Sequence, residues 1–111
     1  MSAGDWRRRA RRAVRAVARR ARALPEPGPR VLRAVFDDWM EVLRAGVDYN
    51  LEHPAPNARD YRTEEGGRFL SDYCNWDRIP QYRDFIENAP AARIGAELMG
   101  SRTVRLFHEH V

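Results

Sequence analysis

The last nine residues constrain the fold most, because the chain ends within a segment that has the pattern of a β-strand. Thr103–Val111 contains β-branched and aromatic residues, lacks Gly and Pro, and follows Gly100 and Ser101. A strand without a following partner is marginally stable in water. We therefore expect the chain to be part of a larger domain, and its exposed strand to promote self-association.

Length and composition predict one soluble globular unit. The chain has 111 residues, of which 43% are hydrophobic and 10% aromatic, so it holds one domain at most. No apolar run approaches the roughly 20 residues that a bilayer span needs. The single cysteine, Cys74, permits no internal disulfide, and we expect an inert, partly buried thiol in a reducing cytoplasm.

The charge is divided unevenly along the chain. Residues 1–23 hold nine arginines and one carboxylate, a net charge of +8, whereas the remaining residues carry −4. Five arginines of residues 1–24 recur at helical steps of four and three: Arg8, Arg12, Arg15, Arg19 and Arg22. One interpretation is a binding arm for nucleic acid, anionic lipid or an acidic partner. A second is an organelle transit peptide, which is also Arg-rich and poor in acidic residues. A third is a disordered tail, or a non-native start read from a GC-rich gene.

Three prolines in residues 25–30 predict an extended linker between this arm and the body, residues 31–111. In the body, Asp37 or Asp38 can cap a helix that runs to about Leu51. The apolar residues spaced by four along this helix predict its buried face; they are Trp39, Leu43, Val47 and Leu51.

The second half of the body alternates turns with regular elements. Thr63–Gly67 has turn composition and leads into a predicted strand, Arg68–Asn75. Pro80 can start a helix over residues 81–87, and Pro90 can start another that ends before Gly100. In this last helix the residues expected to face inward are Ile94, Leu98 and Met99.

Six segments of the body form an ordered series: Ala58–Tyr61, Gly67–Pro80, Tyr82–Phe85, Pro90–Ala92, Ala96–Ser101 and Val104–Val111. In this order and spacing they resemble bacterial members of the phytanoyl-CoA dioxygenase family. The resemblance covers about residues 31–111, and the first thirty residues lie outside it.

The resemblance implies an α+β fold that is the helix-rich N-terminal portion of a double-stranded β-helix, or jelly roll, with two or three strands. It implies an Fe(II) and 2-oxoglutarate dependent oxygenase that hydroxylates a small organic substrate in the full-length family. The family's His-x-Asp, its distal His and its cosubstrate-binding Arg lie downstream of Val111. We therefore assign no catalytic, cofactor-binding or metal-binding residue to this chain, and expect no tight iron or 2-oxoglutarate binding and no activity from the chain alone.

His108 and His110 are the candidate site residues. Residues two apart on a strand point to the same face. In the resembling family this strand continues to a lysine that contacts the cosubstrate, at an even offset beyond His110, which implies that both histidines line the substrate pocket. Two polar side chains inside a barrel, without a ligand, remain the alternative. A metal site would need further ligands, for which only Cys74 and His53 are available.

The remaining notable side chains have structural interpretations. The aromatic residues at strand and helix spacing are expected in the core: Trp39, Trp76, Phe69, Tyr73 and Phe85. Three aspartates, Asp72, Asp77 and Asp84, are interpreted as helix caps and as partners of surface arginines.

Overall fold

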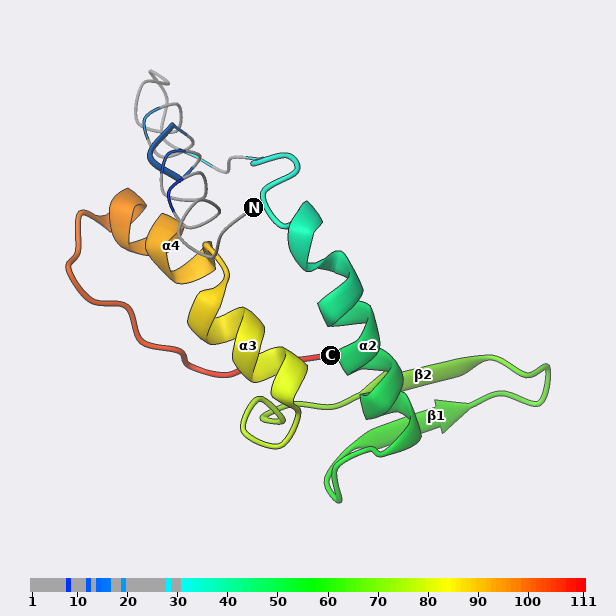
Figure 1. The fold of residues 1–111 in the computed structure, drawn as a ribbon. Coiled ribbons are helices and arrows are strands. Elements are labelled where there is room, and N and C mark those ends of the chain that lie inside the picture. The colour runs from blue at the N-terminus through cyan, green and yellow to red at the C-terminus, as the bar shows by residue number, and fades with distance from the viewer. Residues whose placement is uncertain (1–7, 9–11, 13, 17–18, 20–27, 29–30) are drawn as a thin grey trace. The chain divides into compact units, whose positions relative to one another are not determined.

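In the computed structural model the described residues are 8, 12, 14–16, 19, 28 and 31–111 (Figure 1). They form a small α+β fold with three named α-helices and a two-stranded antiparallel sheet, so the predicted class is confirmed. The element order is η1 (Asp37–Trp39), α2 (Met40–Glu52), β1 (Arg59–Arg62), β2 (Arg68–Ser71), α3 (Pro80–Asn88) and α4 (Ala91–Met99). The chain divides into two compact units, residues 1–37 with 89–105, and residues 38–88 with 106–111.

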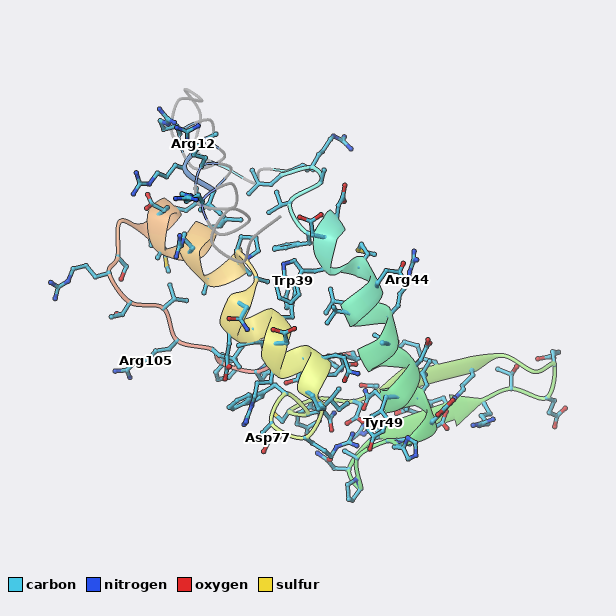
Figure 2. The ribbon with its side chains drawn as sticks, viewed as in Figure 1. Arg12, Trp39, Arg44, Tyr49, Asp77 and Arg105 are labelled. Atoms are coloured by element: carbon cyan, nitrogen blue, oxygen red, sulfur yellow. The ribbon has the colours of Figure 1, made fainter. Side chains whose placement is uncertain are left out.

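The second unit is built around two helices, α2 and α3, that lie side by side (Figure 1). Trp39 at the start of α2 meets Phe85 near the end of α3 edge to face, with ring centroids 5.7 Å apart (Figure 2). Further along, a Cβ atom on Gly46 would lie 2.8 Å from Tyr82 Cε1, closer than Cβ atoms pack. The helices are therefore antiparallel, and Gly46 permits their close approach.

The predicted helix over residues 38–51 corresponds closely to α2, but its buried face differs in detail. The expected apolar stripe is only half-buried, and the fully buried residues of α2 are Gly46 and Asn50. The predicted Asp37 or Asp38 cap is wrong. The helix is preceded by the 3-10 turn η1, whose last residue, Trp39, takes the N-cap position without a side-chain cap hydrogen bond.

The two later helices begin and end near the predicted residues. α3 starts at Pro80, and α4 follows Pro90 and ends where Gly100 adopts a left-handed φ of 62°, a conformation that favours glycine. Ile94 is buried as expected. Leu98 and Met99, in the last turn of α4 before Gly100, are exposed, contrary to prediction.

The sheet is a hairpin closed by the predicted turn. The Thr63 amide donates to the Gly67 carbonyl at 2.9 Å, and the register places Tyr61 opposite Phe69 and Arg59 opposite Ser71. β1 was not predicted. β2 is shorter than the expected strand Arg68–Asn75, because its pairing with β1 ends at Arg59 opposite Ser71. The extended backbone continues only to Cys74, whose φ is 59°.

The strand expected over Thr103–Val111 forms only at its end. Asp72 and Val111 exchange both backbone hydrogen bonds, at 2.9 and 2.8 Å, and the Cys74 amide donates to the Glu109 carbonyl. Residues 103–108 belong to no strand. In this register His108 would pair with residue 75, where the partner backbone has already turned toward α3, so the ladder cannot extend further back.

Other predicted core positions are corrected by the structure. Phe69 and Tyr73 are exposed, whereas Trp39, Trp76 and Phe85 are half-buried. Cys74 is exposed rather than partly buried, because its left-handed backbone lies where the chain leaves the ladder. Asp72, interpreted as a surface cap or ion-pair partner, is completely buried.

The described residues of the Arg-rich arm have helical backbone, and their side chains differ in solvent exposure. Four of the striped arginines are exposed, namely Arg8, Arg12, Arg15 and Arg19, whereas Val14 is buried. The other residues of the arm, and all of the linker except Gly28, lie outside the described residues. Among the described helices, none combines the length and apolarity that crossing a bilayer requires.

Candidate functional site

The predicted site residue His110 lies on one face of the sheet with aromatic and hydroxyl side chains. Paired residues of antiparallel strands point to the same face. Tyr61 pairs with Phe69 on the hairpin, and Tyr73 pairs with His110 in the C-terminal ladder. Ser71 lies between Phe69 and Tyr73 on the same face. We call these five residues the His110 face.

The two histidines have different surroundings. His110 Nε2 forms a hydrogen bond of 2.9 Å with Ser71 Oγ, and its ring meets Tyr73 edge to face at 6.1 Å. His108 is exposed, and its ring lies against Phe107 with centroids 4.6 Å apart. The structure thus brings His110 together with side chains of β2 and its extension, whereas His108 contacts its sequence neighbour.

The opposite side of the same ladder is buried and polar. The largest fully buried side chains among the described residues belong to one isoleucine, Ile79, and three polar residues, Asn50, Asp72 and Asn75. Asp72 accepts hydrogen bonds from the amides of Ala55 and Tyr73, both at 2.9 Å. Both Asp72 carboxylate oxygens are therefore used to fix backbone, one of them in the segment that follows α2.

Arg78 connects two of these buried side chains. Its Nε and Nη2 atoms donate to Asn75 Oδ1 at 3.1 and 2.8 Å, and Nη2 also donates to Asn50 Oδ1 at 3.1 Å. The contact joins α2 to the turn before α3. Charged donors make stronger hydrogen bonds than neutral ones, so this guanidinium is a main link between the two segments.

Glu109 attaches the C-terminal residues to the same turn. Its carboxylate accepts hydrogen bonds from the backbone amides of Asn75 and Trp76, the second at 3.2 Å. Because alternate residues of a strand point to opposite faces, Glu109 points away from the side on which His110 lies. The carboxylate thus holds the segment from below while His110 remains exposed above.

Two polar atoms in this region lack hydrogen bonds. Within the described residues, neither Asn50 Nδ2 nor the Tyr82 hydroxyl has a partner of normal geometry. The Asn50 amide is close enough to favour the Tyr82 phenolate slightly. Burial, together with the nearby Glu109 carboxylate, has the larger effect and raises the pKa of Tyr82 to about 12.

This pKa predicts a stability change at high pH. Tyrosine in the unfolded chain ionises near pH 10, whereas folded Tyr82 ionises near 12. The raised pKa therefore adds to the free energy of unfolding, relative to a fully ionised tyrosine, completely below pH 10, and this addition is lost as the pH rises through 12. A difference of about two units corresponds to roughly 3 kcal/mol. We expect Tyr82→Phe to abolish this loss of stability between pH 10 and 12, as measured by urea unfolding at successive pH values.

At neutral pH the same variant should lose less than about 1 kcal/mol, because the hydroxyl it removes has no partner. Equal dependence of stability on pH above 10 in the parent and in Tyr82→Phe would contradict the assignment.

An ion-pair group on the hairpin completes the charged contacts near the site. Arg68 Nε and Nη2 donate to the Asp60 carboxylate at 2.9 and 3.1 Å, and Arg68 Nη2 also donates to the Leu51 carbonyl at 3.0 Å. The Arg68 guanidinium holds the pKa of Asp60 below its ordinary value. This arginine therefore ties the hairpin to the end of α2.

The geometry does not fit an iron site built from this part of the chain. No three His, Cys, Asp or Glu side chains of the described residues gather as metal ligands. Glu109 and His110 are neighbours in sequence but point to opposite sides of the ladder. His53 stacks on Tyr49, with ring centroids 4.4 Å apart.

Sequence reasoning missed most of the polar residues that support the site. Asn50, Asn75 and Arg78 make contacts with partners up to 34 residues away, which local periodicity does not detect. For Glu109 a signal was present, since the strand parity that groups the two histidines also places Glu109 on the other side. Ser71 has the same parity as Phe69 and could have been grouped with it.

Comparisons of the chain with protein-family models, with curated proteins and with solved structures find no match.

Proposed function

We propose that residues 31–111 form the N-terminal part of an oxygenase of the phytanoyl-CoA dioxygenase type, which hydroxylates a small organic substrate. In that family Fe(II) and 2-oxoglutarate supply the oxidising chemistry. The segments that resemble the family extend from Ala58 to Val111, and this ordered series is the sequence support for the proposal.

The observation that carries the proposal is the two-sided arrangement of Glu109 and His110. Glu109 accepts two backbone hydrogen bonds on the buried side, whereas His110 lies on an exposed face with Ser71 and Tyr73. A binding strand needs this combination, since side chains position a ligand well only when the backbone beneath them is rigidly held. The role proposed for the His110 face is to line the substrate pocket of the complete domain.

The first test is the transcript. We expect the cDNA beyond the Val111 codon to encode a strand with a lysine, followed by His-x-Asp.

The second test is turnover. The 111-residue chain should release no succinate from 2-oxoglutarate with iron and ascorbate, whereas the longer product should do so. A cDNA without such a motif in any frame, or succinate release by the 111-residue chain above a His108→Ala, His110→Ala control, would contradict the proposal.

A further inference from the structure

One edge of strand β2 is paired with β1. In an antiparallel pair, hydrogen-bonded residues alternate with residues whose backbone groups point away from the partner. Thr63 bonds to Gly67 across the hairpin, so in this register Phe69 and Ser71 also direct their amides and carbonyls toward β1. Arg68 and Leu70 consequently direct theirs toward the opposite edge.

That opposite edge is already occupied further along. Asp72 exchanges two hydrogen bonds with Val111, and Cys74 bonds to Glu109. Asp72 has the same parity as Leu70 and Arg68, so all three residues belong to one edge. Glu109–Val111 therefore covers only the last part of the edge.

The uncovered part is in register with this ladder. No described residue bonds to the backbone of Leu70 or Arg68 on this side. If the ladder continues, the first residue after Val111 lies opposite Ser71, the second opposite Leu70 and the fourth opposite Arg68. The second and fourth would then exchange backbone hydrogen bonds with β2.

The two faces of β2 also determine where the side chains of an added strand would lie. A residue opposite Ser71 lies on the His110 face, and a residue opposite Leu70 lies on the buried side together with Val111 and Asp72. Leu70 is half-buried, so the side chain beside it is expected to be apolar. An uncovered edge flanked by Leu70 would otherwise favour pairing with other chains.

We propose that the open edge of β2 binds an extended strand in this register, and that its occupant is the segment that follows Val111 in the longer protein. The choice of occupant rests on the proposed function. The argument for it is continuity, because the ladder formed by Glu109–Val111 points along the open edge and needs no turn to reach Leu70. The pairing would place every second residue of that segment on the His110 face.

The experiment measures amide hydrogen exchange at Leu70 and Arg68. The full chain is compared with the chain extended by the natural residues from the cDNA, and with the chain extended by Thr-Val-Thr-Val-Thr. We expect both extensions to slow exchange at Leu70 and Arg68 by about tenfold or more. Exchange at Asp72 and Val111 reports in each protein whether the existing ladder is intact.

Proline supplies a matched control for register. Proline at the second added position removes the amide that would donate to the Leu70 carbonyl and points its ring at the backbone of β2, so the pairing, and with it the protection of the Leu70 amide, should be lost. Proline at the third added position removes an amide that points away from β2, so protection of Leu70 should remain. Equal effects of the two prolines would overturn the proposed register.

Other outcomes separate the two proposals. If the designed extension protects Leu70 but the natural one does not, the occupant is wrong. If the chain without an extension already protects Leu70 in a concentration-dependent way, a second copy occupies the edge, which also overturns the proposed occupant. A cDNA without His-x-Asp would refute the proposed function, yet protection by the designed extension would still establish the register of the edge.

Discussion

Replacing Arg78 with methionine is expected to lower the free energy of unfolding by about 2 to 4 kcal/mol. Methionine keeps much of the length of the side chain but removes all three hydrogen bonds to Asn50 and Asn75. Both acceptors belong to buried side chains, so each would be left without its charged donor. Chemical denaturation followed by circular dichroism measures the change.

The matched control is Arg44→Met. Arg44 is an exposed arginine of α2, paired with Glu41 at 3.0 Å in the i,i+3 arrangement, and it points away from α3 (Figure 2). Exposed pairs of this type contribute little, so the variant should change stability by less than about 0.5 kcal/mol. A similar loss in both variants would show that Arg78 acts only through general charge or solubility.

The conservative variant Arg78→Lys distinguishes geometry from charge. Lysine retains the positive charge but cannot reproduce the planar arrangement that lets Arg78 reach Asn75 and Asn50 together. We expect it to recover only part of the stability lost in Arg78→Met. Full recovery would mean that a positive charge at this position is sufficient.

The elements predicted well from sequence are those specified by local features. The starts of α3 and α4 follow from Pro80 and Pro90, whose fixed φ suits the beginning of a helix. The end of α4 follows from Gly100, and the hairpin turn follows from the composition of residues 63–67. In each case the residues that decide the structure lie within one turn of it.

The prediction of a C-terminal strand failed over most of its length, because strand formation depends on a distant partner. Its composition is suitable over nine residues, but only Glu109–Val111 finds a partner backbone, since the opposing segment turns at Cys74 and Asn75. Strand propensity describes suitability for a sheet and not the presence of a neighbour. The length of the ladder was therefore not readable from Thr103–Val111 itself.

The candidate site shows the same division. That His108 and His110 share a parity was predictable, but the bond between His110 and Ser71 spans 39 residues and depends on how the ladder pairs. The buried polar residues were hidden for another reason. Asparagine on a helix is usually exposed, and only the approach of Arg78 makes a buried Asn50 favourable.

Replacing Glu109 with alanine is expected to release the C-terminal ladder. The carboxylate accepts the amides of Asn75 and Trp76, and its removal leaves both donors without that partner, at a cost of about 2 to 3 kcal/mol. The amides of Asp72 and Val111 should exchange faster, and His110 should lose its fixed contact with Ser71. Amide exchange together with urea unfolding measures both effects.

Two comparison variants make the result specific to Glu109. Glu87→Ala removes an exposed carboxylate of α3, 4.0 Å from Arg83, and should leave the ladder unchanged. Glu109→Gln keeps one side-chain oxygen as acceptor, so its free energy of unfolding and its amide exchange at Val111 should lie between those of the parent and Glu109→Ala.

The pKa of Tyr82 gives an independent measurement of the same contact. The Glu109 charge is the second cause of its elevation, after burial, so removing that charge should lower the pKa from about 12 without returning it to 10. If Glu109→Ala changed neither this pKa nor exchange at Val111, the carboxylate would not lie under the ladder. The positioning of His110, on which the proposed function depends, would then need another cause.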